Sequence, residues 1–126
     1  MQTYIAVALF RKERINFYSI RCHRRIKVDI DAYVLDTLMR GLVGHDRHPS
    51  AFLVYLFLWR MTHGKGRPRV QIALTDIAEN TGLSKRSVQG ALTRLIKRKL
   101  ISIERESITA IPRYTVLRPW TRTNAD

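Results

Sequence analysis

Six basic side chains lie between Ser84 and Leu100, and no acidic side chain lies among them: Lys85, Arg86, Arg94, Lys97, Arg98 and Lys99. Guanidinium and ammonium groups bind phosphate oxygens, and Arg and Gln side chains also pair with the edges of bases. A solvated helix surface usually mixes both signs of charge, and this stretch does not. This basic stretch therefore predicts contact with a polyanion, and its residue types suit one that carries both phosphates and bases.

The composition of the whole chain agrees with this prediction. Its 126 residues include 23 Lys+Arg and 10 Asp+Glu, a formal net charge of +13, and 45% are hydrophobic. This length and composition predict one domain with a real core. The positive excess favours nucleic acid or an anionic membrane surface as the partner, ahead of an acidic protein groove. A single cysteine, Cys22, excludes an intrachain disulfide framework and is compatible with a reducing cytosol.

The sequence favours neither a membrane-spanning helix nor export. The longest apolar run, residues 51–59, is far shorter than the roughly 20 residues that a transmembrane helix needs. The N-terminal apolar stretch has no charge before it and basic residues where a cleavage site should follow, which argues against a signal peptide. We expect a cytoplasmic, nucleoid-associated protein with no membrane contact.

The hydrophobic period changes along the first part of the chain. Residues 1–27 predict a β-like extension, because apolar residues alternate with polar ones, an alternation seen at Ile15 and Phe17 and again at Ile26, Val28 and Ile30. From residue 31 the spacing is helical, which predicts an amphipathic helix capped by Asp29 or Asp31 and ended by Gly44. Its apolar positions are Val34, Leu35, Leu38, Met39, Leu42 and Val43.

A second helix is predicted from Ala51 to about Thr62, capped by Ser50 and ended by Gly64. Its apolar residues, including Trp59, run all round it, so it belongs at the centre of the fold. A basic loop, 65–69, then leads to a short strand at 70–74. Two further alternating runs, 100–105 and 113–117, predict a β-ribbon.

Two helices joined by a tight turn are predicted between the strand and the ribbon. Thr75 is the expected cap of the first, Ser84 caps the second, which runs to about Lys99, and Gly82 permits the left-handed turn between them. The small Ala78 lets the helices cross closely. The side chains expected to attach the second helix to the core are Val88, Leu92, Leu95 and Ile96.

The segment Leu74 to Ile101 resembles a helix-turn-helix, and with the preceding strand and following ribbon it resembles the winged variety of MarR and GntR regulators. It is also similar to winged-helix modules of phage and plasmid replication proteins, in which a nearly all-apolar helix precedes the motif. The residues that carry the resemblance are Ile77, Ala78, Gly82, Leu83, Val88, Ala91 and Leu92. The resemblance implies a mainly α fold with a small β-sheet: a winged helix-turn-helix at 28–118, after the extension at 1–27 and before a polar tail at 119–126.

The face of the second helix opposite its apolar side is the predicted DNA-reading surface, placed in the major groove. The candidates for base contacts are Arg86, Gln89, Gly90 and Thr93. Arg pairs with guanine, Gln with adenine, and a Thr methyl with the thymine methyl. Gly90 costs about 1 kcal/mol relative to alanine in mid-helix. We therefore expect the backbone to approach DNA there, in preference to close packing against another helix.

Phosphate contacts are expected around this face. On the helix the candidates are Ser84, Lys85, Ser87, Arg94, Lys97, Arg98 and Lys99. A second backbone contact is expected from Lys65, Arg67 and Arg69. In the ribbon the candidates are Arg105 and Arg113, but Glu104 and Glu106 flank Arg105 and would repel phosphate, so its tip alternatively faces a protein.

Other chemistry has weaker support. His45, Asp46 and His48 lack a further ligand group, and a metal site is not expected. Cys22 and His23 are adjacent on a predicted strand, where they point to opposite faces, so a thiol nucleophile is not expected either. No phosphate-binding glycine loop, carboxylate pair or Ser/His/Asp set is present. We expect no catalytic residue, no cofactor and no enzymatic activity.

The sequence thus predicts sequence-specific binding of double-stranded DNA, first as a small transcriptional regulator. A homodimer reading two half-sites is expected, with the first helix, the extension or the Trp120 tail as its interface. The alternative is the DNA-binding module of a phage or plasmid replication initiator or recruitment factor, with a protein partner at the ribbon or extension. A third alternative is a winged helix that contacts only protein.

Overall fold

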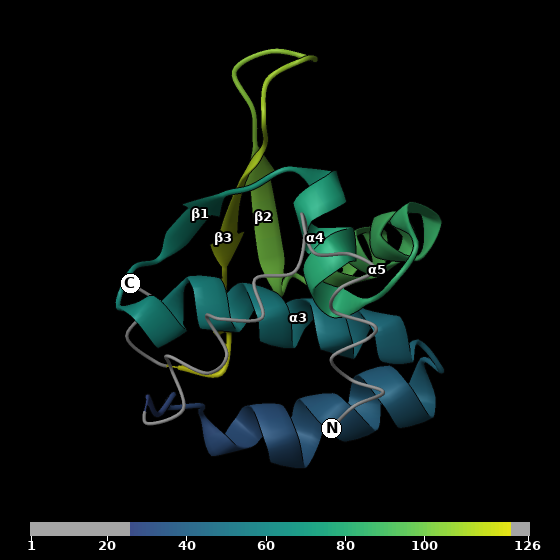
Figure 1. Cartoon of the computed structure of the whole chain (residues 1–126). Helices are drawn as coiled ribbons and strands as arrows, with labels where there is room; N and C mark the ends of the chain where they lie inside the picture. The colour runs from purple at the N-terminus through teal and green to yellow at the C-terminus, as the bar shows by residue number, and fades with distance from the viewer. Residues whose placement is uncertain (1–25, 122–126) are drawn as a thin grey trace, which may run out of the picture.

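Helix α3 (Pro49–Met61) runs through the middle of the molecule because its side chains are buried on several sides. In the computed structural model, which describes residues 26–121, an N-terminal helix lies along one side of α3, and α4, α5 and a small sheet lie on the other (Figure 1). The fold is mainly helical with a three-stranded antiparallel sheet, as predicted, and it is compatible with a winged helix.

Helix α3 begins earlier than the sequence predicted. His48 is its N-cap and Pro49 occupies its first turn, where a missing N–H costs nothing. The predicted cap, Ser50, is therefore inside the helix, with its hydroxyl 3.2 Å from His48 Nδ1. Trp59 is 2% exposed, which confirms it as a core residue.

The N-terminal helix is wound more loosely than an α-helix. Two π-helical segments compose most of it, η1 (Val34–Leu38) and η2 (Arg40–His45). With more residues per turn, side chains four apart lie almost above one another. Only Val34, Leu38 and Leu42 are buried, and the other three predicted core positions, Leu35, Met39 and Val43, form an exposed stripe. The predicted end at Gly44 is also wrong, because the helix continues to His45.

Residues 26–31 form no strand, so the β-like prediction is wrong for the described end of the extension. Val28 and Ile30 pack against the core, and the Trp59 indole N–H donates to the carbonyl of Asp29 at 2.8 Å. The Trp59 side chain thus occupies the carbonyl that would otherwise pair with a neighbouring strand. Residues 1–25, which carry the rest of that prediction together with Cys22 and His23, lie outside the described part of the chain.

The sheet consists of β1 (Arg69–Gln71), β2 (Ile101–Glu104) and β3 (Arg113–Val116) in the order β1-β3-β2. Val70, Tyr114 and Ile103 are opposite one another and face the core. Because successive side chains point to opposite faces, the next row, Gln71, Arg113 and Glu104, faces outward. The loop that joins β2 and β3 projects away from the body (Figure 1).

Helices α4 (Leu74–Thr81) and α5 (Lys85–Lys97) form the predicted helix-turn-helix. Gly82 ends α4 with a φ of 77°, in the left-handed region that glycine tolerates. Ser84 caps α5, and its hydroxyl oxygen accepts from the Ser87 backbone N–H at 3.1 Å. Helix α4 begins at Leu74 with Ala73 as its N-cap, so Thr75 lies inside the helix and is not its cap.

The C-terminal end of the described chain packs back on the N-terminal helix. The Trp120 ring stacks on Tyr33 with 4.6 Å between ring centroids, and its indole N–H donates to Asp31 Oδ2 at 3.0 Å. The Arg118 guanidinium also contacts this carboxylate, at 3.5 Å. The Asp31 carboxylate therefore anchors the C-terminal segment, while its backbone carbonyl accepts from the Val34 N–H at 3.0 Å at the start of the helix.

Candidate nucleic-acid interface

Helix α5 attaches to the body through one face. Val88, Ala91, Leu92 and Leu95 are buried on it, at the spacing of successive helical turns. Ile96, predicted to join this set, is 44% exposed and lies at the edge of the helix that faces the β2–β3 loop. The attachment therefore involves Ala91 in place of Ile96.

The predicted base-reading residues lie together on the free side of α5. Arg86, Gln89, Gly90 and Thr93 are all exposed. The Thr93 hydroxyl donates to the Gln89 carbonyl at 3.0 Å, which leaves its methyl group as the part available to a base. The structure thus brings these four residues onto one accessible helical surface, which is the arrangement that major-groove contact requires.

Gly90 has space around it. A Cβ atom at this position would meet only the His48 ring, 3.7 Å from Nε2, which is an ordinary van der Waals distance. Packing against a neighbouring helix therefore gives no reason for a glycine here, and approach of the backbone to DNA stays a prediction. His48, which the sequence suggested was only a loop residue, lies beside the candidate interface.

The start of α5 has its polar groups engaged locally. The Ser84 hydroxyl donates to Ser87 Oγ at 3.1 Å while accepting from the Ser87 N–H. Lys85 is exposed. A phosphate at this end would therefore find the Lys85 ammonium directly accessible, whereas contact with either serine would have to share these hydrogen bonds.

Arg98 differs from the other predicted phosphate contacts. Its guanidinium donates to both carboxylate oxygens of Asp46 at 2.8 Å, across 52 positions of sequence, and it passes over Gly41. The hydrogen bonds from Arg98, followed by the contact of His45, hold the pKa of Asp46 well below its usual range. Arg98 therefore ties α5 to the N-terminal helix, and a phosphate would have to displace a bidentate carboxylate to reach it. Lys97 and Lys99 are exposed, and Arg94 is half-buried.

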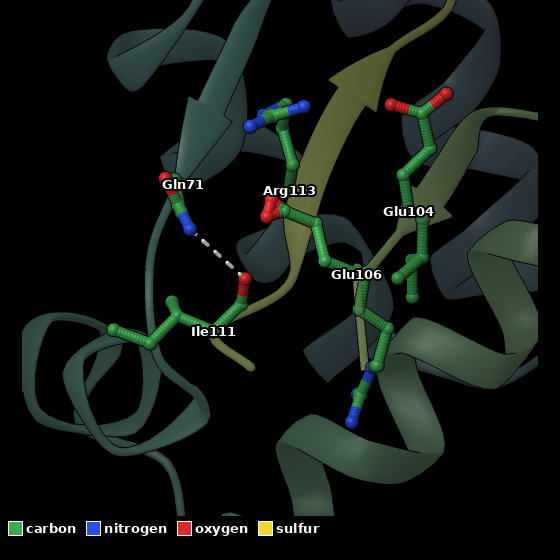
Figure 2. A pocket seen from close by; sticks show the side chains of 7 residues that line it. Gln71, Glu104, Glu106, Ile111 and Arg113 are labelled. Carbon is green, nitrogen blue, oxygen red and sulfur yellow. Dashed lines mark hydrogen bonds between the residues drawn. The ribbon is translucent and has the colours of Figure 1, made fainter. Parts of the chain in front are cut away.

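The three consecutive charged residues of the β2–β3 hairpin, 104–106, differ in the surfaces they line. Glu104 and Glu106 line a hollow on the outer face of the sheet with Gln71 and Arg113 (Figure 2). Arg105 alone of the three consecutive charged residues also lines the groove between the hairpin and α5. The expected repulsion of phosphate by the two carboxylates thus applies to the outer face, which carries Arg113, more than to the side of Arg105.

The basic loop after α3 is remote from α5. It lies at the C-terminal end of α3, whereas α5 packs near the other end (Figure 1). The Arg67 Nε–H donates to the Met61 carbonyl at 2.9 Å, and Arg69 and Lys65 are exposed. The structure does not bring Lys65, Arg67 and Arg69 together with the α5 surface, so any DNA contact by this loop would be a separate one.

Other kinds of site find little support between residues 26 and 121. This range contains no group of three or more His, Cys, Asp or Glu side chains placed to hold a metal ion. Asp46, which lies between His45 and His48 in the sequence, is instead bound by Arg98 and His45. In the same range, no helix has the length and apolar character needed to cross a membrane.

Comparison with known proteins supports one of the two resemblances drawn from sequence. Neither the curated proteins nor the solved structures include a match to this chain. The family model of bacteriophage replication protein O matches residues 30–117, a range that begins just before η1 and ends just after β3. The MarR and GntR resemblance receives no such support. The chain therefore belongs to the bacteriophage replication protein O family, a DNA-binding family.

Proposed function

We propose that this protein is the double-stranded DNA-binding module of a phage replication initiator or recruitment factor, and that α5 reads the major groove. The observation that carries the proposal is the free face of α5, where base-reading and phosphate-binding side chains are exposed with no acidic residue between them. Family membership favours this role in replication over the transcriptional regulator that the sequence placed first.

The charges of the described surface support duplex DNA as the partner. Lys85 and Lys97 are exposed near the two ends of α5, and Arg86 lies one helical position from Lys85. A helix of this length is about 20 Å long, which matches a segment of one major groove. The terminal lysines contact phosphates on either side of the groove while the middle of the helix meets base edges.

We further propose that the module works without chemistry of its own. Its described side chains offer no metal cluster, and the two glutamates of the hairpin, Glu104 and Glu106, lie on its outer face. That outer face presents both signs of charge and suits a protein partner better than DNA. The module would then hold DNA with α5 and another replication protein with the sheet.

A homodimer is also part of the proposal. Leu35, Met39 and Val43, which are 48%, 41% and 37% exposed, lie at fourth-residue spacing along the N-terminal helix. Asp36 and Arg40 flank this stripe and have opposite charges. Two such helices packed antiparallel would place each aspartate near the other copy's arginine, which makes the surface self-complementary under twofold symmetry. Met39→Glu should convert a dimeric sedimentation coefficient to that of a monomer.

Selection of bound duplexes from a random pool tests the function. The protein should enrich a definite sequence and bind it more weakly as salt rises, since phosphate contacts release counterions. Arg86→Ala and Gln89→Ala should relax the preference at one or two positions, whereas Lys97→Ala should weaken all duplexes alike. Lys27→Ala, an exposed basic residue on the far side of α3, is the matched control and should change neither.

Two results would reject parts of this proposal. Equal binding of every duplex at physiological salt would remove sequence reading by α5. A shift of no duplex even at low salt, together with binding of an acidic protein, would establish a winged helix used only for protein contact. Genomic position also separates the two DNA-binding roles: origin repeats or a helicase loader nearby support replication, and a divergent promoter with an inverted repeat supports regulation.

A further inference from the structure

Ile108 is the most exposed large hydrophobic residue of the described chain, at 90%. It lies at the tip of the β2–β3 hairpin, in a turn closed by a hydrogen bond from the Ala110 N–H to the Ser107 carbonyl at 3.2 Å. Turn corners normally carry Gly, Pro, Asn, Asp or Ser. A β-branched apolar side chain here gains nothing from the fold, which leaves its contact to be made with something outside it.

Two residues of the hairpin fix the backbone of this turn. The Arg105 guanidinium donates to the carbonyl of Ile108 at 3.3 Å, and Pro112, which is buried, fixes the backbone where the loop rejoins β3. The hairpin projects beyond the rest of the molecule (Figure 1). Ile108 thus lies at the end of a projecting hairpin whose turn is fixed by other residues. A loop that contacts only solvent would not need its turn fixed in this way.

Ile108 also belongs to a groove that reaches the DNA-reading helix. The groove has a volume of about 520 Å³ and lies between the hairpin and α5. Its lining includes Gln89, Thr93 and Ile96 from α5, and Ile103, Ile108 and Ile111 from the hairpin side. Ile96 and Ile111 are about half exposed, at 44% and 50%. The hairpin tip is therefore continuous with the proposed base-reading surface through an apolar floor.

The charges around the tip favour a nucleic acid as the occupant. Residues 107–112 carry no charge. Arg105 lines this groove and also the hollow on the outer face of the hairpin, whereas Glu104 and Glu106 line that hollow and not the groove (Figure 2). An uncharged apolar tip beside an arginine is suited to a groove floored by base edges and bordered by phosphates.

We propose that Ile108 is an apolar wedge that enters the minor groove next to the major groove occupied by α5 and partly unstacks one base step there. The inference rests on the proposed function, because it requires α5 to bind duplex DNA. Apolar side chains inserted from the minor groove open a base step and bend the duplex toward the major groove. A kink of this kind would give a replication protein a locally weakened step in its binding site.

The proposal is tested with duplexes of the selected sequence in which 2-aminopurine replaces one base at a time along the flank beside the α5 site. Fluorescence of 2-aminopurine rises when the base loses its stacking. Wild-type protein should raise it several-fold at one or two adjacent positions. Ile108→Ala should abolish the rise and reduce the DNA bend in a circular-permutation gel assay, and Ile108→Leu should retain both. Since Ile108 is almost fully exposed, none of these variants should affect folding.

Leu53→Ala is the matched control, because it also truncates an exposed aliphatic side chain but lies on α3, outside the groove and the dimer stripe. It should leave the fluorescence unchanged. Tight binding of the wild type with no fluorescence rise at any position would overturn the wedge while leaving the proposed function intact. A full rise with Ile108→Ala would do the same and would show that another part of the protein opens the step. Failure of the wild type to bind any duplex would overturn both proposals.

Discussion

Arg98, at the end of α5, donates to both carboxylate oxygens of Asp46 at 2.8 Å and so joins α5, the proposed DNA-reading helix, to the end of the N-terminal helix. The Asp46 side chain is only 6% exposed, whereas that of Arg98 is 35% exposed. The pair therefore has one desolvated partner and one that solvent reaches. It fixes the orientation of α5 on the side away from the hairpin.

Removing the carboxylate should destabilise the protein. Asp46→Ala leaves the Arg98 guanidinium without its partner, and we expect the free energy of unfolding to fall by about 1–2 kcal/mol. Urea unfolding followed by circular dichroism measures the change. Asp29→Ala, at an exposed aspartate that precedes the N-terminal helix, should alter stability by less than about 0.5 kcal/mol. Equal losses in the two variants would show that the ion pair contributes nothing specific.

The contribution of Asp46 should depend on pH in the acid range. Its pKa in the folded protein is lowered, mainly by Arg98, whereas in the unfolded chain it is about 3.9. The unfolded state therefore binds a proton first as pH falls, so the stabilisation is fully present above about pH 5 and is lost progressively below about pH 4. The stability difference between wild type and Asp46→Asn should be constant from pH 5 to 8 and shrink below that range. A difference that grew toward low pH would contradict the sign.

Lys97 and Arg98 are neighbours in sequence and should differ in function. Lys97→Ala should reduce the slope of log affinity against log salt by about one, because it removes one phosphate contact. Arg98→Ala should leave that slope almost unchanged while lowering thermal stability, since its guanidinium is bound to Asp46. The salt dependence of each variant's affinity is measured by fluorescence anisotropy with a labelled duplex, at a temperature where circular dichroism shows the variant folded. A similar slope change in the two variants would show that Arg98 leaves Asp46 to bind phosphate.

Lys99 and Gly82 both have left-handed backbone conformations, but only Gly82 is the residue type that this conformation favours. Each follows a helix with a positive φ, 60° for Lys99 and 77° for Gly82. Lys99→Gly should stabilise the protein by about 0.5–1 kcal/mol, because glycine adopts this region without steric cost. Gly82→Ala should destabilise it by about 1 kcal/mol through the backbone alone, since a Cβ there has open space around it.

Thermal unfolding provides the measurement for this pair. Lys99→Ala removes the same charge as Lys99→Gly but keeps a Cβ, so it separates the electrostatic effect from the conformational one. If Lys99→Ala stabilised as much as Lys99→Gly, the gain would come from relieved charge repulsion among the basic residues of α5. That result would also show how strongly these charges repel one another without DNA.

The helix-turn-helix was largely predictable from the sequence because its determinants are local. Gly82 marks the left-handed turn, Ser84 caps α5, and Val88, Leu92 and Leu95 recur at helical spacing. These signals depend on backbone sterics and on a period of 3.6 residues, and each acts within one or two turns. The exposed base-reading stripe follows from the same period, since it lies opposite the buried face.

The N-terminal helix shows where such rules fail. Its apolar residues fit an α-helical period, yet the π-helical winding buries Val34 and Leu38 and leaves Leu35 and Met39 outside. Because both of these adjacent stripes are apolar, hydrophobicity does not decide which one is buried. That depends on how the helix packs against α3. The sequence therefore determined that a helix forms but not which face it turns inward.

The sequence by itself determined the basic charge, the helix-turn-helix and the residue types that we propose contact DNA. Only the tertiary structure decided which charges are available and what stands beside them. Arg98 binds a carboxylate 52 positions away, Trp120 binds Asp31 across 89 positions, and Arg105, unlike Glu104 and Glu106, lines the groove beside α5. The physical reason is range: propensities and periodicity act between near neighbours, whereas ion pairing and the sharing of a groove depend on which distant segments the packed core brings together.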